Sequence, residues 1–203
     1  MALGDAYATA AEFKGYADHF TDSTDDTQIT EVLLQASRAV EHVCGRQFNK
    51  ATSASARVFF PDSHCLAVVD DFHTITDLVI ETDSGDGGTY PTTVASTGYA
   101  LEPVNGIVEG ESGWPFYRIL AVNSYWPTYT VRPPIRVTAQ WGWTAVPTNI
   151  KVAAIYTALE TFKLKGAPFG VAGFGEFGPM RVRENPRVMS MLEPYTRRRV
   201  LMA

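Results

Sequence analysis

The chain has 203 residues, is 45% hydrophobic and carries a net charge of −5, values typical of a globular protein with one substantial core and room for an inserted lobe. This acidic balance argues against a protein whose main task is to bind nucleic acid, because phosphate binding needs a concentrated excess of Lys and Arg. No uncharged apolar run approaches the roughly 20 residues that span a bilayer, and the first residues lack the basic end and apolar stretch of a signal peptide, so we expect a protein that stays inside the cell.

Two helices are predicted near the N-terminus. Thr9 followed by Glu12 fits a capping box, which predicts a short helix directly after it. Between Thr27 and Cys44 apolar residues recur at helical spacing, and Gly45 stands where a left-handed C-terminal cap would lie. The second of these segments is the clearest helix in the sequence.

The middle of the chain has a different character. Between Ala51 and Trp143, short β-branched and aromatic runs alternate with Gly, Pro, Asp and Ser, a pattern typical of a small antiparallel β lobe. The predicted strands are Arg57 to Phe60, Leu66 to Asp70, Ile75 to Glu81, Phe116 to Val122 and Ile135 to Trp141.

Helical signals return after this lobe. Pro147 and Thr148 open a third helix, which Gly166 closes. Asn185 followed by Pro186 is a cap with proline at the first helical position, so a last helix is predicted to start there. The predicted fold class is therefore α+β, a small bundle of about four helices with an inserted antiparallel β lobe. Residues 1–50 hold the N-terminal helices, 51–143 the lobe, and 144–203 the C-terminal helices, a Gly-rich loop and a basic tail.

The third helix is apolar on more than one face. One stripe contains Ile150, Ala153, Ala154 and Ala158, and another contains Val152, Ile155, Tyr156, Leu159 and Phe162. A helix that is apolar nearly all round needs neighbours on several sides, and these could be its own domain or other copies of the chain. We expect the subunit interface to include Val152, Tyr156, Leu159, Phe162, Phe174 and Phe177.

None of the chemical motifs nominates a catalytic, cofactor-binding or metal site. The segment GFGEFG matches the dinucleotide fingerprint in letters but lacks the strand before it and the helix after it, so a flexible loop with phenylalanine anchors is favoured. His42 with Cys44, and His64 with Cys65, lack the usual zinc-ligand spacings. We expect no cofactor, no metal ion and, for the two cysteines, free thiols in a reducing compartment.

Charge is unevenly distributed along the chain. From Gly178 onward six arginines face two glutamates, so this tail carries +4 and the remainder −9. Arg197, Arg198 and Arg199 could bind phosphate, a membrane surface or a partner's carboxylates, or form a solvated C-terminus.

The helix ending in SRAVEHVCGRQF, the central β insertion, and the tail from TNIKVAAIYTALETFKLKGAPFGVAGFGEFGPMRV to EPYTRRR together resemble the head-to-tail connector (adaptor, or head-completion) proteins of long-tailed bacteriophages, in particular phages that infect actinobacteria. The resemblance covers both ends of the chain, roughly half of it, and the insertion is recognised only by its position. It implies a virion protein of the phage neck, assembled in the host cytoplasm, that forms a dodecameric ring under the portal.

In such a ring the adaptor extends the DNA channel used in genome ejection and provides the surface where a stopper or tail-completion protein docks. Its partners would be other copies of itself, the portal protein and the stopper, with DNA only as passing cargo and no membrane contact. The resemblance makes Arg197, Arg198 and Arg199 the portal-docking end. Two rival hypotheses remain: a small cytosolic enzyme whose site in the β lobe uses some of Asp70, Asp71, His64 and His73, and a nucleic-acid-binding module that uses the basic tail.

Overall fold

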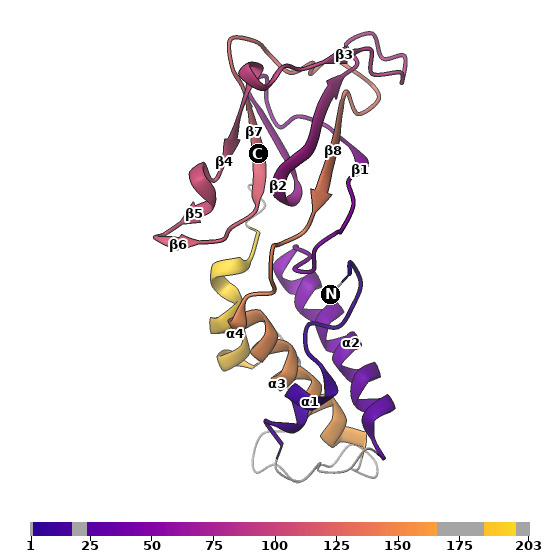
Figure 1. Ribbon diagram of the computed structural model, residues 1–203, viewed down its shortest axis with the longest axis vertical. Coiled ribbons are helices and arrows are strands. Elements are labelled where there is room, and N and C mark those ends of the chain that lie inside the picture. The colour runs from indigo at the N-terminus through magenta and orange to yellow at the C-terminus, as the bar shows by residue number, and fades with distance from the viewer. Residues whose placement is uncertain (1, 18–23, 166–184, 198–203) are drawn as a thin grey trace. The chain divides into compact units, whose positions relative to one another are not determined.

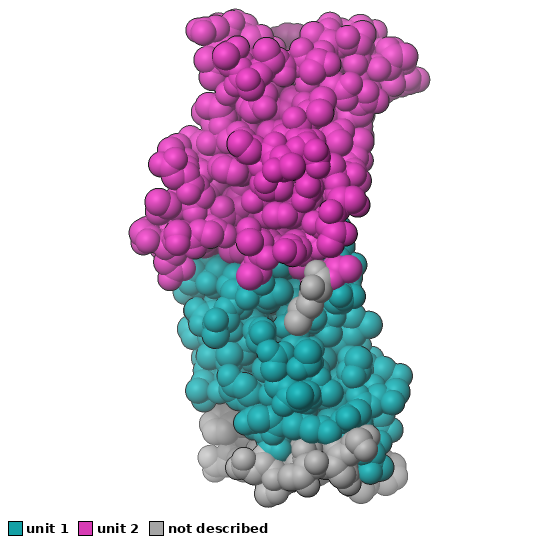
Figure 2. Space-filling model, in the orientation of Figure 1, with its two compact units in different colours: residues 1, 3–48, 146–203 teal, residues 2, 49–145 magenta. Residues whose placement is uncertain are grey.

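A computed structural model of the chain describes residues 2–17, 24–165 and 185–197 (Figure 1). Apart from its first two residues, the chain divides into two compact units (Figure 2). The first, here called the helical unit, comprises residues 3–48 and 146–203; the second, the β unit, comprises residues 49–145. With helices in one unit and an antiparallel sheet in the other, the predicted α+β class with a β lobe is confirmed.

The described part of the helical unit contains four α-helices: α1 Ala10–Lys14, α2 Asp26–Cys44, α3 Thr148–Lys165 and α4 Pro186–Leu192, the last followed by the 3-10 turn η5 Glu193–Tyr195. The predicted helix signals are found in place. Thr9 and Glu12 form a reciprocal capping box at α1, and Gly45 ends α2 with a left-handed φ of 63°. The Asn185 side chain accepts hydrogen bonds from the first amides of α4, where Pro186 occupies the first turn.

The core of the helical unit forms where α3 packs on α2, and α3 packs on α4 as well. The helix faces match this arrangement, since α2 buries one apolar stripe while α3 buries residues on several sides. One cluster of buried side chains joins the segments; it contains Ala8, Phe13, Ile29, Leu33, Ala36, Ile155, Ala158 and Leu159. Neighbours within the same chain therefore cover much of the apolar surface of α3.

Tyr7 anchors the N-terminal segment to α2. Its backbone N–H donates to the Ser37 hydroxyl at 2.9 Å, and its own hydroxyl donates to the Glu41 carboxylate and accepts from the Phe48 N–H at 3.0 Å. The ring is fully buried and packs edge-to-face on Phe48. Burial raises the pKa of the tyrosine hydroxyl, so this group stays a proton donor.

The β unit contains one six-stranded antiparallel sheet and a separate two-stranded hairpin. The sheet follows the order β1-β8-β2-β7-β4, and β3 pairs with one end of β2. Its strands are β1 Ser55–Phe59, β2 Leu66–Thr82, β3 Thr92–Thr93, β4 Tyr99–Glu102, β7 Phe116–Ala121 and β8 Ile135–Trp141; β5 Ile107–Val108 and β6 Glu111–Ser112 form the hairpin. The β unit also contains two 3-10 turns, η1 Ser96–Gly98 and η2 Val104–Gly106.

Two predicted strands, Leu66 to Asp70 and Ile75 to Glu81, are a single 17-residue strand, β2, so this prediction of separate strands was wrong. The register of β2 against its neighbours shifts between Val68 and Phe72 and again between Thr74 and Val79, where Asp77 has a φ of 59°. Bulges of this kind bend a strand and break the alternation of apolar and polar residues without ending the strand.

The short strands β3, β4, β5 and β6 were not predicted. Each has only two to four residues, too few for alternation to be recognised. Apart from β2, the longer strands agree closely with prediction: β1 begins two residues and ends one residue before the predicted strand, and β8 has the predicted bounds.

The chain enters and leaves the β unit at adjacent positions. Lys50 and Gly142 form an isolated antiparallel bridge, and the Ala51 N–H donates to the Trp141 carbonyl at 2.7 Å. A Cβ on Gly142 would stand 1.7 Å from the Asn49 carbonyl oxygen, and its φ is +94°, so only glycine fits this crossing.

Candidate assembly surface

The predicted interface residues of α3 lie partly in the core of the helical unit. Leu159 is buried in the cluster, and the half-buried Tyr156 and Phe162 pack against it. The Tyr156 ring packs edge-to-face on Tyr16 at 6.0 Å between centroids, and the Phe162 ring packs on Phe13 at 5.9 Å. Side chains of the same chain thus cover part of the apolar surface of α3.

Two of these side chains keep part of their surface in solvent. Val152 is half-buried, as is Tyr156, whose ring lies 4.9 Å from the Arg187 guanidinium in a cation–π contact. Of the predicted assembly residues, Phe174, Phe177, Arg198 and Arg199 lie outside the described residues.

Arg197 follows the final turn of the described chain. Its backbone N–H donates to the Cys44 carbonyl at 2.8 Å, which satisfies one of the carbonyls at the end of α2. The arginine segment therefore starts from a point fixed to that helix end. Burial raises the pKa of the Cys44 thiol to about 12, so this cysteine is an unreactive core residue.

Exposed apolar side chains are concentrated in the β unit. Eleven large apolar side chains of the described chain are exposed, and nine of them belong to this unit: Val58, Phe60, Ile75, Val79, Val104, Ile107, Tyr125, Tyr129 and Val131. The other two are Tyr16 and Leu34. Single exposed apolar side chains are ordinary on a protein surface, so only those that lie side by side indicate a region that contacts other proteins.

Three rings of the β unit form an aromatic cluster on its surface. The His64 ring stands 6.2 Å from Tyr125 and 5.9 Å from Tyr129, and its Nδ1 lies 3.2 Å from the Thr128 hydroxyl. Tyr125 is 74% exposed and Tyr129 is 93% exposed. Tyrosines that offer both an apolar face and a hydroxyl are enriched at protein interfaces. The sequence analysis missed this cluster, although the run SYWPTYT carries the signal.

The β5–β6 hairpin is a second exposed feature. Its two-residue turn, Glu109–Gly110, has positive φ at both positions, as a tight hairpin turn requires. Its base is held by the buried Trp114, whose ring stands 5.0 Å from that of Trp143. Ile107 is exposed on the hairpin and Val104 on the η2 turn that precedes it.

The residues of the enzyme hypothesis have separate structural partners. Asp70 forms an ion pair with Arg57 at 2.7 Å, while the buried Asp71 accepts a hydrogen bond from the Trp143 indole at 3.0 Å. His64 belongs to the aromatic cluster. Burial, followed by the charge of Lys50, lowers the pKa of His73, which favours a neutral ring. Asp70, Asp71 and His64 thus each contact a different structural partner.

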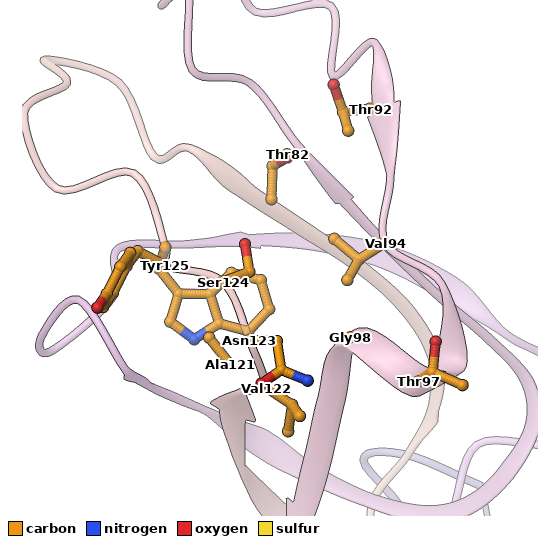
Figure 3. A pocket seen from close by; sticks show the side chains of 11 residues that line it. Thr82, Thr92, Val94, Thr97, Gly98, Ala121, Val122, Asn123, Ser124 and Tyr125 are labelled. Carbon is orange, nitrogen blue, oxygen red and sulfur yellow. The ribbon is translucent and has the colours of Figure 1, made fainter.

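A shallow cavity of about 460 Å³ opens between the end of β7 and the segment that carries β3 and η1 (Figure 3). Side chains with hydroxyl or amide groups line it together with small apolar ones, including Thr82, Thr92, Thr97, Asn123 and Ser124. Its lining contains no ionisable group other than the Tyr125 phenol, so it offers neither a carboxylate nor a histidine for acid–base chemistry.

Two further findings concern metal ions and membranes. Within residues 2–17, 24–165 and 185–197, no three His, Cys, Asp or Glu side chains are grouped to hold a metal ion, and Cys44 and Cys65 are free thiols. None of the described helices is long and apolar enough to cross a bilayer.

Solved structures with the same fold come from gene transfer agent (GTA) particles. A chain in the neck of the native GTA particle computed with C12 symmetry matches with a TM-score of 0.56 and 19% identity, over 100% of this chain and 99% of that one. A chain in the neck of the empty particle computed with C6 symmetry matches with a TM-score of 0.56 and 21% identity, over 100% of this chain and 99% of that one. A chain in the virion of the native particle also matches with a TM-score of 0.56, at 20% identity, over 100% of this chain and 99% of that one. No protein-family model and no curated protein sequence matches the chain. At these identities the likeness establishes a shared fold.

Proposed function

We propose that this chain is a structural virion protein of the neck of a phage or phage-like particle, related to the adaptors of long-tailed phages, including those that infect actinobacteria. Twelve copies form a ring beneath the portal and connect the capsid to the tail. The ring extends the channel through which the genome leaves, so DNA is cargo. The other partners are the portal protein and a stopper or tail-completion protein, and assembly takes place in the host cytoplasm.

The observation that carries this proposal is the match in fold along the entire chain to chains from GTA necks. The match includes both the helical segments and the inserted sheet, since it covers 100% of this chain and 99% of the other. One of those necks was computed with C12 symmetry, which is the symmetry of a ring of twelve equal positions.

The charge of the β unit is compatible with a channel protein. It contains ten acidic and five basic residues, and three of the acidic side chains are held by arginines: Asp70 by Arg57, Glu81 by Arg136 and Glu102 by Arg118. A surface with excess negative charge repels phosphate and lets DNA slide without sticking.

The proposal assigns roles to the predicted residues. Val152, Tyr156, Leu159 and Phe162 build the helical unit or its contact with the next copy, and Val152 and Tyr156 have the exposed surface for that contact. Phe174 and Phe177 contact neighbouring copies. Arg197, Arg198 and Arg199 dock on the portal.

The test uses the full chain and the particle that contains it. Native mass spectrometry and negative-stain microscopy of the purified chain are expected to show closed rings, and antibodies against the chain are expected to label the head–tail junction of purified particles. Particles whose necks lack the polypeptide, as judged by labelling and by mass spectrometry of isolated necks, would refute the proposal.

A further inference from the structure

Two strands of the main sheet have a neighbour on one side only. Within the described residues, β1 pairs with β8 alone and β4 pairs with β7 alone, and these strands end the sheet on opposite sides (Figure 1). A strand at the edge of a sheet directs a row of N–H and C=O groups outward, where they can pair with another strand.

Several of the features that usually prevent such pairing are absent from both edges. Soluble proteins protect edge strands with lysine, proline or bulges, but Ser55–Phe59 and Tyr99–Glu102 contain no lysine and no proline, and both ladders keep an unbroken register. The charged residues at the two edges have partners within the chain, because Arg57 binds Asp70 and Glu102 binds Arg118.

The buried face of the sheet extends to both edges and is incompletely covered there. Phe59 of β1 stands opposite the fully buried Ile135, and Leu101 of β4 stands opposite the fully buried Ile119. Phe59 and Leu101 are themselves only half-buried. A strand added at either edge would complete the burial of these side chains, a gain that scales with the apolar area removed from water.

The topology fixes the direction in which two copies can join. Every pairing from β1 through β8, β2 and β7 to β4 is antiparallel, so β1 and β4 run in the same direction. Neighbouring copies in a large ring differ by a small rotation, which preserves strand direction. Such a rotation would place β4 of one copy parallel to β1 of the next, a head-to-tail contact that repeats until the ring closes.

We propose that β4 of each copy pairs in parallel with β1 of the next copy, so that the sheets join into one continuous β layer around the ring. The inference rests on the proposed ring and identifies the strands that form it. The strands have similar lengths, four residues in β4 and five in β1, and each lacks a partner on its outer side within the described chain.

The first test places a charge on one edge. Val58 is 48% exposed on β1, so Val58→Lys is expected to leave the chain folded while lowering the fraction assembled into rings by about tenfold or more, because a lysine at an edge opposes strand addition. Ile75→Lys is the matched control, since Ile75 is 65% exposed and lies on β2 away from both edges. Equal ring fractions for the two variants, with both folded by circular dichroism, would overturn the inference.

The second test joins the two edges covalently. In a Cys65→Ser background, which removes the exposed thiol, Val58→Cys and Ala56→Cys are each combined with Ala100→Cys on β4. Mild oxidation is expected to give a ladder of covalent multimers for at least one combination and none for the single variants. Thr27→Cys with Ala100→Cys is the control, because Thr27 is an exposed residue of α2.

The outcomes separate this inference from the proposed function. Rings that form without a cross-linked ladder in either combination would overturn the edge pairing and leave the neck assignment standing. Covalent dimers from Val58→Cys alone would indicate β1 against β1, a two-fold contact, and would also overturn it. A chain that is monomeric in solution and absent from isolated necks would overturn both.

Discussion

The Lys151 ammonium lies 2.7 Å from the Glu12 carboxylate, in an ion pair that joins the first turn of α3 to α1. Glu12 is also the second member of the capping box. Its carboxylate therefore caps the first turn of α1 and also links α1 to α3. Hydrogen bonds from Lys151 and then from the Thr9 backbone lower the pKa of Glu12.

Lys151→Met is expected to lower the free energy of unfolding by about 0.5 kcal/mol at pH 7, because both side chains are about a third exposed and water screens the pair. Since the folded pKa of Glu12 is depressed, the pair stabilises the protein above the ordinary glutamate pKa of about 4.3, and this stability is lost as pH falls through the folded pKa. Urea denaturation at pH 7 and pH 3 should therefore show a larger difference between variant and parent at the higher pH.

Glu12→Gln supplies the control for this pair, because glutamine preserves the capping box without the charge. Adding Lys151→Met to Glu12→Gln should have little further effect. A full, pH-independent loss in that background would show that Lys151 acts through packing of its alkyl chain.

Adjacent leucines on α2 offer a comparison of core and surface. Leu33 is fully buried in the cluster with Ile155 and Leu159, so Leu33→Ala should reduce stability by about 2 to 5 kcal/mol. Leu34 is 41% exposed, and Leu34→Ala should change stability by about 0.5 kcal/mol or less. Chemical denaturation of both variants measures the contrast, and similar losses would mean that the exposed face of α2 is covered in solution.

Two glycines with nearly the same φ allow the cost of backbone strain to be measured separately from the cost of a steric clash. Gly113 has a φ of +91° and open space around a new Cβ, so Gly113→Ala should cost about 1 to 2 kcal/mol from the left-handed backbone alone. Gly142 has a φ of +94° and an Asn49 oxygen 1.7 Å from that Cβ, so Gly142→Ala should cost on the order of 4 kcal/mol or more. Thermal unfolding of the pair checks this order, and equal melting temperatures would contradict the close crossing.

Replacing Phe174 and Phe177 with serine is expected to leave the monomer folded and to impair ring assembly. The expectation comes from the sequence, where glycines surround aromatic residues that would each contribute about 1.5 to 3 kcal/mol if buried against a neighbouring copy. Circular dichroism reports the fold, and native mass spectrometry reports the ring. Rings as abundant as those of the parent chain would show that these phenylalanines make no essential contact.

Local signals explain what could be predicted about the helices. Thr9 with Glu12, Gly45 after α2, and Asn185 before Pro186 each specify a helix end through contacts within one turn, and all three occur as expected. The strands of the sheet were harder to predict than the helices. The bulges of β2 interrupt its alternation of apolar and polar residues, and the two-residue strands depend on partners distant in sequence.

The surface was less predictable than the fold. The sequence showed that α3 is apolar on many sides, but it left open which neighbours cover these sides, because composition shows that a face needs covering without showing what covers it. The sequence analysis did not identify Tyr125 and Tyr129 as surface residues, because aromatic side chains are usually expected in a core. Their exposure depends on a loop path between β7 and β8 that no periodic pattern encodes.

The bridge between Lys50 and Gly142 has an evolutionary consequence. An inserted segment whose two ends lie next to each other can lengthen, shorten or be replaced by another segment while the flanking helices keep their connection. Descendants of one ancestral chain could thus exchange or remodel this segment to suit new docking partners and retain the helices nearly unaltered.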